Sequence, residues 1–294
     1  MRYYSLNRYC RDTFGEKLYK LSLDGGMTCP NRDGTLSSLG CLYCSAGGSG
    51  DFAADRSLSI KEQLSAAKEK VASKSSCEHF IAYFQAFTNT YGPVSYLEAI
   101  YRTALDTPEI AGISIATRPD ALPSEVLELL ARLKAEYPDK FLWIELGLQT
   151  IHAATATYIR RGYPLSVFTQ AVNRLHEIGI PVIVHVILGL PGETSEDMLQ
   201  TICYLNNSPV WGVKLQLLHV LKGTDLAVEY EQGNFQVLSQ EDYLTILIKC
   251  IAALRPDMVI HRVTGDGAKE LLLAPTWSLH KKSVLNELHH RLKA

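Results

Sequence analysis

Three cysteines in the first part of the chain are the residues whose types and spacing most directly suggest chemistry. Cys29, Cys41 and Cys44 fall within sixteen residues in the pattern C-x11-C-x2-C. Glycines surround them, and because a glycine carries no side chain, the backbone there can approach a bulky inorganic group closely. In a chain without an export signal, this spacing predicts metal or iron–sulfur binding rather than a disulfide framework.

The number of cysteines distinguishes two kinds of site. A structural zinc ion takes four ligands, and a [4Fe–4S] cluster held entirely by protein takes four cysteines. Three thiolates would leave one iron of a cluster open to chelate S-adenosylmethionine (SAM), whose reductive cleavage gives a 5′-deoxyadenosyl radical. Tyr43, between the two close cysteines, is suited to pack beside the adenine. The alternative is a zinc knuckle with a remote fourth ligand, and the spacing leaves both interpretations open.

The composition is that of an ordinary globular protein. The chain has 294 residues, 47% of them hydrophobic and 20% charged, and its net charge is −2. The most apolar run, Ile180 to Leu190, is too short to cross a membrane, and the N-terminus has no apolar signal region. We therefore expect a cytoplasmic protein without a membrane partner. The net charge does not indicate a nucleic-acid binder, although RNA contacts need only a local basic face.

Apolar runs typical of strands alternate with amphipathic stretches typical of helices. The runs are short and rich in Ile, Val, Leu and aromatic residues, and they cover 18–23, 80–87, 112–117, 141–148, 181–188 and 212–219. Six strand–helix units favour a parallel sheet with helical crossovers but are too few for a complete eight-unit barrel. The sequence therefore predicts an α/β fold, a partial (βα)6 TIM-like barrel with functional residues after the carboxyl ends of its strands.

The predicted helices lie between these strands, near 60–73, 95–104, 124–136, 166–178 and 195–206. Two of them begin with capping signals, since Ser59 stands three residues before Glu62 and Thr194 stands three before Asp197.

After about residue 225 the alternation changes to a helix at 239–254, a strand at 258–263 and a last helix at 279–292. We therefore expect an N-terminal extension (1–17), a core barrel (18–225) and a small C-terminal α/β appendage (226–294).

Polar residues follow several of the predicted strands. Gln85, Thr88 and Asn89 lie where the second strand ends, either as ligand contacts or as a polar strand end that caps the next helix. Arg118 and Asp120 end the third strand, either as contacts to SAM or substrate or as an ion pair within the loop.

Other polar residues are candidates for the mouth of the barrel. They are His219, Lys222 and Thr224 after the sixth strand, and His261, Arg262 and Asp266 in the appendage. The basic stretch 280–293 could meet RNA phosphates, but its apolar residues recur at helical spacing and favour a packed helix with a solvated face. The remaining cysteines have no paired spacing and are expected to be buried apolar residues or surface thiols: Cys10, Cys77, Cys203 and Cys250.

Six motifs, in order along nearly the whole chain, resemble the YtqA/YhcC group of radical SAM proteins. They are the cysteine loop, Tyr83 to Tyr91 (YFQAFTNTY), Ala116 to Asp120 (ATRPD), Glu145 to Thr150 (ELGLQT), Gly189 to Thr194 (GLPGET) and His261 to Gly267 (HRVTGDG). That group is a small relative of the elongator catalytic subunit and of oxygen-independent coproporphyrinogen oxidase. The resemblance implies a partial (βα)6 radical SAM barrel with a [4Fe–4S] cluster on Cys29, Cys41 and Cys44.

The resemblance also implies which side chains contact SAM. Gln149 matches a Gly-Val-Gln in the coproporphyrinogen enzyme, and Arg161 stands at the place of an arginine that grips a carboxylate. Where relatives hold the SAM amino group with a glycine-rich turn, this chain has Gln85 and Thr88. His185 stands where relatives often carry an Asp that faces SAM, although a lone histidine in a strand is more often a core residue.

For the reaction, the resemblance implies modification of the wobble uridine of tRNA, with a reductant such as flavodoxin or ferredoxin as a second partner and no DNA. MnmL-type members of the group are associated with converting 5-carboxymethylaminomethyl-uridine to 5-aminomethyl-uridine. Two alternatives stay open at this point: a radical SAM enzyme that acts on a small molecule such as a tetrapyrrole, and a zinc-stabilised, non-catalytic RNA-binding module.

Overall fold

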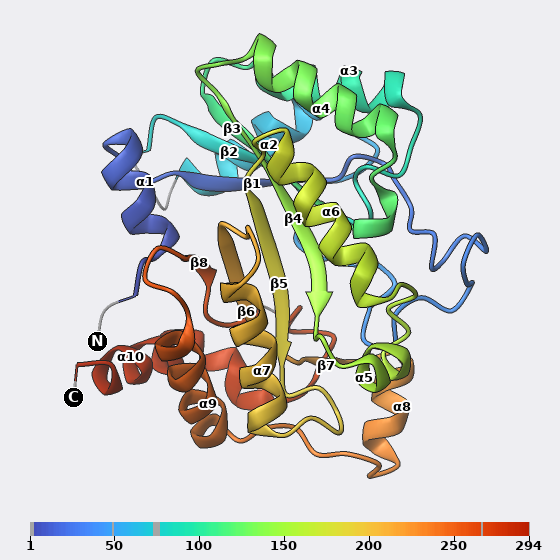
Figure 1. Ribbon diagram of the computed structural model, residues 1–294, viewed down its shortest axis with the longest axis vertical. Coiled ribbons are helices and arrows are strands. Elements are labelled where there is room, and N and C mark those ends of the chain that lie inside the picture. The colour runs from blue at the N-terminus through green and yellow to red at the C-terminus, as the bar shows by residue number, and fades with distance from the viewer. Residues whose placement is uncertain (1–2, 49, 73–76, 266, 294) are drawn as a thin grey trace.

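The computed structural model describes residues 3–48, 50–72, 77–265 and 267–293. Seven parallel strands form one curled sheet, a partial barrel, in the order β1-β2-β3-β4-β5-β6-β8 (Figure 1). Their bounds are β1 (Tyr19–Leu23), β2 (Phe80–Phe84), β3 (Ile110–Thr117), β4 (Phe141–Gln149), β5 (Val182–Leu188), β6 (Gly212–Leu217) and β8 (Val259–Arg262). The predicted α/β fold with a partial barrel is confirmed.

The helices that cross between neighbouring strands pack on one face of this sheet. They are α2 (Ile60–Ala72), α3 (Val94–Leu105), α4 (Ser124–Glu136), α6 (Leu165–Glu177) and α7 (Ser195–Asn206). Further elements are α5 (Ala153–Tyr158), α8 (Asp225–Glu231), α9 (Gln240–Ala253), α10 (Lys281–Arg291), the short 3-10 helices Pro119–Ala121 and Thr276–His280, and the antiparallel pair β7 (Val220–Leu221) and β9 (Leu272–Ala274). Within the described ranges, no helix has the length and apolar character needed to cross a bilayer.

Both predicted capping signals are present at the starts of their helices. At α2, the Glu62 carboxylate accepts from the Ser59 amide at 2.8 Å while Ser59 Oγ accepts from the Glu62 amide at 3.4 Å. Thr194 and Asp197 form the same reciprocal pair at α7. These bonds satisfy amide groups that the first helical turn leaves without a partner.

Two strands end earlier than the sequence predicts: the sixth, predicted to run to residue 219, ends at Leu217, and the second ends earlier still. We expected the second strand to run to Phe87, but β2 ends at Phe84. The backbone of Phe87 has a φ of 58°, in the left-handed region, which a strand cannot contain. The chain turns here toward the site described below.

The N-terminal extension contains a helix that the sequence analysis did not assign, α1 (Leu6–Phe14), which begins at an N-cap of Ser5. It packs at the amino-terminal end of the barrel. Tyr9 lies edge-on to Trp211 and Trp143, with ring centroids 4.9 and 6.1 Å apart. Each such aromatic pair is worth about 0.5–1.5 kcal/mol beyond the area it buries. These rings belong to an apolar cluster at this end of the barrel, which we call the plug: Cys10, Leu18, Ile81, Trp143 and Ile183, with Tyr9 and Trp211 packed against them.

Strand β8 lies in the segment after residue 225 and yet belongs to the main sheet, where it pairs in parallel with β6. Its last residue, Arg262, lies opposite Lys214 of β6. The C-terminal part of the chain therefore supplies one wall of the barrel interior.

Strand β4 shows how the sheet sorts its side chains, because successive residues of a strand point to opposite faces. One set packs into the core beneath the helices: Leu142, Ile144, Leu146 and Leu148. The alternate set faces the barrel interior: Trp143 in the apolar plug, then Glu145, Gly147 and Gln149 along the wall of a pocket. Along β4 toward its carboxyl end, the interior of the barrel is therefore first apolar, then charged, and then forms the pocket.

Candidate functional site

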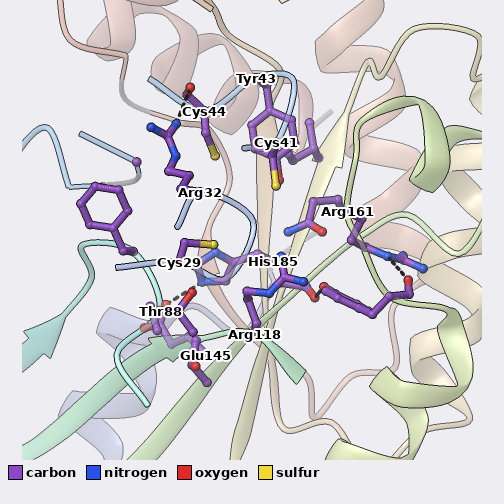
Figure 2. Close-up of a pocket in the computed structure, with 18 of the residues that line it drawn as sticks. Cys29, Arg32, Cys41, Tyr43, Cys44, Thr88, Arg118, Glu145, Arg161 and His185 are labelled. Atoms are coloured by element: carbon purple, nitrogen blue, oxygen red, sulfur yellow. Dashed lines mark hydrogen bonds and ion pairs between the residues drawn. The ribbon is translucent and has the colours of Figure 1, made fainter. Parts of the chain in front are cut away.

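The cysteine loop lies between β1 and α2, at the open end of the barrel. Figure 2 shows the sulfur atoms of Cys29, Cys41 and Cys44 around one pocket, which all three residues line. The Cys44 amide donates to the Cys41 carbonyl at 3.1 Å. Arg32 holds the far side of the loop, since its Nη2 donates to the carbonyls of Cys44 at 2.9 Å and Ser45 at 2.5 Å. These bonds hold the backbone of the loop at Cys41 and Cys44.

A hydrogen bond between the thiols of Cys41 and Cys44 shifts their pKa values in opposite directions. A hydrogen bond from Cys44, followed by the Asn31 amide and the charges of Arg118 and Arg32, lowers the pKa of Cys41 to about 6. The Asn31 Nδ2 lies 3.5 Å from the Cys41 sulfur. The hydrogen bond to Cys41, together with burial, raises the pKa of Cys44 well above its usual value, so Cys41 is the one of this pair that ionises more readily.

The number of donors in the loop bears on the kind of group it could hold. Among the described residues, no three His, Cys, Asp or Glu side chains are grouped so that they could hold one metal ion. The three cysteines line one pocket. Three thiolates would leave one iron of a [4Fe–4S] cluster without a protein ligand.

The structure brings most of the predicted SAM-binding residues to this pocket. Its lining includes, besides the cysteines, Tyr43, Thr88, Gln149, Arg161 and His185. Gln85 does not line it; this residue lines an adjoining chamber instead. Asn89 is buried, and its side-chain amide donates to the carbonyls of Ala86 and Ala116 at 3.0 Å, so it supports the loop after β2.

Arg161 is held in place by hydrogen bonds to three backbone carbonyls. Its side chain is buried, and its Nη1 donates to the carbonyls of Leu148 at 2.9 Å and Thr150 at 2.6 Å. Its Nε donates to the Tyr163 carbonyl at 3.1 Å. These bonds fix the turn at the end of β4, and Arg161 is one of the residues that line the pocket.

Arg118 forms one of the two contacts that the sequence left open and also lines the pocket. Its Nε and Nη2 donate to the two oxygens of Asp120 at 2.9 and 2.7 Å, which is the expected ion pair within the loop. The same guanidinium lies 5.0 Å above the Tyr163 ring and lines the pocket. The pair is bidentate and almost buried, so it presents an oriented cation to the site.

Three non-glycine residues of the described chain have a positive φ, and all three surround this pocket. Phe87 and Gln149 line it, with φ of 58° and 61°. Arg160 has a φ of 56°, and its carbonyl accepts from Asn31 at 2.7 Å beside Cys41. Such conformations cost about 1–3 kcal/mol each and gather at functional sites, which supports assigning this pocket a function.

A buried group of charges forms the floor of the pocket. Glu145 on β4 accepts from Lys20 at 2.5 Å and from His185 at 2.7 Å, and it forms an ion pair with Lys214. Ser114 donates to it at 2.6 Å. We call Lys20, Glu145, His185 and Lys214 the charged layer; its members come from β1, β4, β5 and β6. Sequence analysis noted Glu145 and His185 but not the two lysines that meet them.

The charged layer holds one carboxylate among cations. Burial by itself raises the pKa of Glu145, but the charges of Lys20 and Lys214 outweigh it and hold that pKa well below its usual value. Burial, reinforced by the charge of Lys214, lowers the pKa of His185 to about 4. At neutral pH the layer therefore contains an ionised Glu145, a neutral His185 and a lysine on either side.

The lowered pKa of His185 predicts a pH dependence of folding. Between about pH 6.5 and pH 4 the unfolded chain binds a proton here and the folded chain does not. This contribution to stability is thus complete above pH 6.5 and is lost as the pH falls through that window. We expect the urea midpoint of the wild type to fall more steeply over this range than that of His185→Gln. His176→Gln, at an exposed site on α6, should keep the wild-type slope; equal slopes in wild type and His185→Gln would contradict the assignment.

The remaining candidates lie in different places. His219 and Arg262 line the adjoining chamber, and His261 stacks edge-on against Trp211 in the plug. Thr224 caps α8, and Lys222 is exposed. Asp266 lies outside the described residues.

The cysteines outside the loop and the basic C-terminal stretch take ordinary structural positions. Cys10 and Cys250 are buried, Cys77 is half-buried and Cys203 is exposed, as expected of apolar residues and surface thiols. In α10, Val284 and Leu288 face the core.

Comparison with known proteins places the chain. The profile of the Radical SAM superfamily matches residues 34–205, and that of the Radical_SAM C-terminal domain matches residues 210–294. The chain is 43% identical to YtqA of Bacillus subtilis over 292 residues, covering 99% of this chain and 90% of that protein. It is 35% identical to YhcC of Escherichia coli over 279 residues, covering 95% and 88%.

Among solved structures, the Elp3 of Methanocaldococcus infernus has the same fold. It superposes with a TM-score of 0.66 over 87% of this chain, at 16% identity, and this chain spans 58% of that one. The chain therefore belongs to the radical SAM superfamily, whose enzymes cleave SAM at a [4Fe–4S] cluster, and within it to the family of YtqA and YhcC.

Proposed function

We propose that Cys29, Cys41 and Cys44 hold the [4Fe–4S] cluster of this enzyme and that SAM binds in the pocket beside them. The observation that carries the proposal is the arrangement of three thiols around one pocket. When bound, the cluster supplies the electron that splits SAM into methionine and a 5′-deoxyadenosyl radical, which abstracts a hydrogen atom from the substrate.

The pocket residues have distinct parts in this proposal. Tyr43 offers an aromatic face to the adenine, and Thr88 and Gln149 offer hydrogen-bonding groups to the ribose and methionine moieties. Arg118 and Arg161, which both line the pocket, supply positive charge for the SAM carboxylate. His185 also lines the pocket, and its Nε2 donates to Glu145, so the other nitrogen of the neutral imidazole can accept a hydrogen bond.

For the substrate, we propose the wobble uridine of tRNA, with conversion of 5-carboxymethylaminomethyl-uridine to 5-aminomethyl-uridine in the cytoplasm and a flavodoxin or ferredoxin as electron donor. Two things support this: the resemblance of six ordered motifs, and a fold shared with an Elp3. The chemistry is favourable, because the carbon between the amine and the carboxylate gives a radical stabilised by both neighbours once the deoxyadenosyl radical has taken its hydrogen. Loss of one electron from this radical to the oxidised cluster, and of a proton, would give an imine. Addition of water to the imine would then release the aminomethyl group and the two-carbon fragment as glyoxylate.

The substrate is tested with tRNA that carries the carboxymethylaminomethyl group. The reconstituted, reduced enzyme with SAM is expected to convert this nucleoside to 5-aminomethyl-uridine, as measured by mass spectrometry of tRNA digests. SAM cleavage should rise when this tRNA is added and should not rise with tRNA lacking the modification. If SAM is cleaved while the nucleoside is unchanged, the substrate proposal is wrong and a small-molecule substrate takes its place.

A further inference from the structure

A second chamber opens beside the cysteine pocket. The two cavities share Tyr43, Cys44, Gly48, Ile187 and Gln216, so a ligand in the chamber would lie against the site proposed for SAM. The volume of the chamber is about 590 Å³, which is within the range of small-ligand sites, about 300–1,000 Å³. One nucleobase with its ribose therefore has room next to the pocket.

Part of the chamber wall is an exposed aromatic ring. Phe52 is 56% exposed and lines the chamber. Among the large apolar side chains that the described part of the chain exposes, it is the one that lines either cavity. An aromatic face that is open to a cavity offers a surface on which a planar ligand can stack.

The backbone that carries this ring is fixed by hydrogen bonds just after Phe52. The Ala53 amide donates to the Gly50 carbonyl at 2.8 Å, which closes a tight turn around the residue. The Ala54 amide donates at 3.0 Å to the carbonyl of Ser22 on β1. The turn is thus tied to the barrel, and because its backbone is already ordered, less conformational entropy is lost when a ligand stacks on the ring.

The other walls of the chamber suit the remaining surfaces of a nucleobase. A base has two apolar faces and a polar edge, and the edge of uracil carries one N–H donor between two carbonyl acceptors. Gln216 on β6 lines both cavities, and its amide can donate and accept. Four aliphatic side chains add apolar lining: Ile187, Leu217, Leu218 and Leu221.

We propose that Phe52 stacks on the base of the substrate nucleotide after that base has turned out of its strand into the chamber. Unpaired bases of RNA loops are commonly bound in this way, splayed out and stacked on aromatic side chains. The inference rests on the proposed function, whose reacting base is the wobble uridine of a tRNA loop. It makes Phe52 the residue that holds this base beside the SAM pocket.

The inference is tested by binding, without turnover. The full-length protein is titrated with two anticodon stem-loop RNAs, one with uridine at the wobble position and one with an abasic ribose there. The wild type should bind the uridine RNA about tenfold or more tightly than the abasic RNA. Phe52→Ala should remove this preference, and Phe52→Tyr should keep it, because the tyrosine ring stacks as the phenylalanine ring does.

Leu36→Ala is the matched control. Leu36 is also apolar and 53% exposed, but it lines neither cavity, so this variant should keep the wild-type preference for the uridine RNA. The urea midpoints of Phe52→Ala and Phe52→Tyr should equal that of the wild type, since the ring is exposed. A lost preference then reports the missing stack and not a defect in folding.

The outcomes separate this inference from the proposed function. A wild type that binds neither RNA, or binds both equally, overturns the role of Phe52, and so does Phe52→Ala with the full preference for uridine. Preference for the uridine RNA without conversion of the carboxymethylaminomethyl group in tRNA would sustain the stacking site and sink the proposed reaction. Conversion of that tRNA by a wild type that binds both RNAs equally would do the reverse.

Discussion

Replacing Cys41 by alanine is expected to remove the iron–sulfur cluster and to lower SAM cleavage by about a thousandfold or more, because the cleaving electron comes from the cofactor and not from the protein. Two thiolates would remain for a cluster that needs three. The loop itself should persist, since Arg32 holds it through the carbonyls of Cys44 and Ser45. Iron and sulfide analysis, together with deoxyadenosine production under reducing conditions, measures both effects.

Cys203→Ala is the matched control for this prediction. Cys203 lies on α7, exposed and away from the cysteine loop, so its loss should leave cluster content and SAM cleavage at the wild-type level. Cys29→Ala and Cys44→Ala should behave as Cys41→Ala does. A Cys41→Ala protein that keeps its full iron content would show that Cys41 is not a ligand.

Glu145→Gln is expected to produce the largest loss of folding stability. The substitution keeps the shape of the side chain but removes the one negative charge between Lys20 and Lys214, whose side chains are 19% and 3% exposed. Removing one partner of a buried ion pair costs about 3–5 kcal/mol, because the other charge stays behind without compensation. Urea unfolding at neutral pH measures the free energy of unfolding, and Glu128→Gln, exposed on α4, should change it little.

A double variant separates this mechanism from a simple packing defect. In Glu145→Gln/Lys214→Met the buried lysine is also removed, so the uncompensated charge is smaller and part of the lost stability should return. The two substitutions would then be strongly non-additive. Two results would contradict the account of the charged layer: a Glu145→Gln protein as stable as the wild type, or a double variant whose loss relative to the wild type equals the sum of the two single losses.

Much of the fold could be predicted because hydrophobic periodicity and capping residues are local features of the sequence. The helices α4 and α7 begin and end where their periodicity predicts, and the capping residues Ser59 and Thr194 mark their helices in the sequence. Strand ends are less local. Phe87 is apolar and extends the pattern of β2, but the turn into the site places it at a positive φ, and only the tertiary structure fixes that turn.

The sequence predicted that the three cysteines form the site, but it predicted only some of the residues around them. A charged residue near the middle of an apolar strand, such as Lys214 in β6, is visible in the sequence as an exception. Lys20 and Lys214 both contact Glu145 because of the register and curvature of the sheet. The sequence of a single strand does not reveal how it pairs with the others. Three backbone carbonyls likewise hold Arg161. These contacts depend on how the chain folds after β4, which the spacing of the motifs does not reveal.

The most direct test of the central claim is the metal content and spectrum of the anaerobically purified and reconstituted protein, followed by SAM cleavage with a chemical reductant. The account predicts a brown protein with about four iron and four sulfide ions per chain, which converts SAM to methionine and 5′-deoxyadenosine and loses both properties in Cys41→Ala. A colourless protein with a single zinc ion, or one whose cluster survives the loss of Cys29, Cys41 and Cys44, would contradict it.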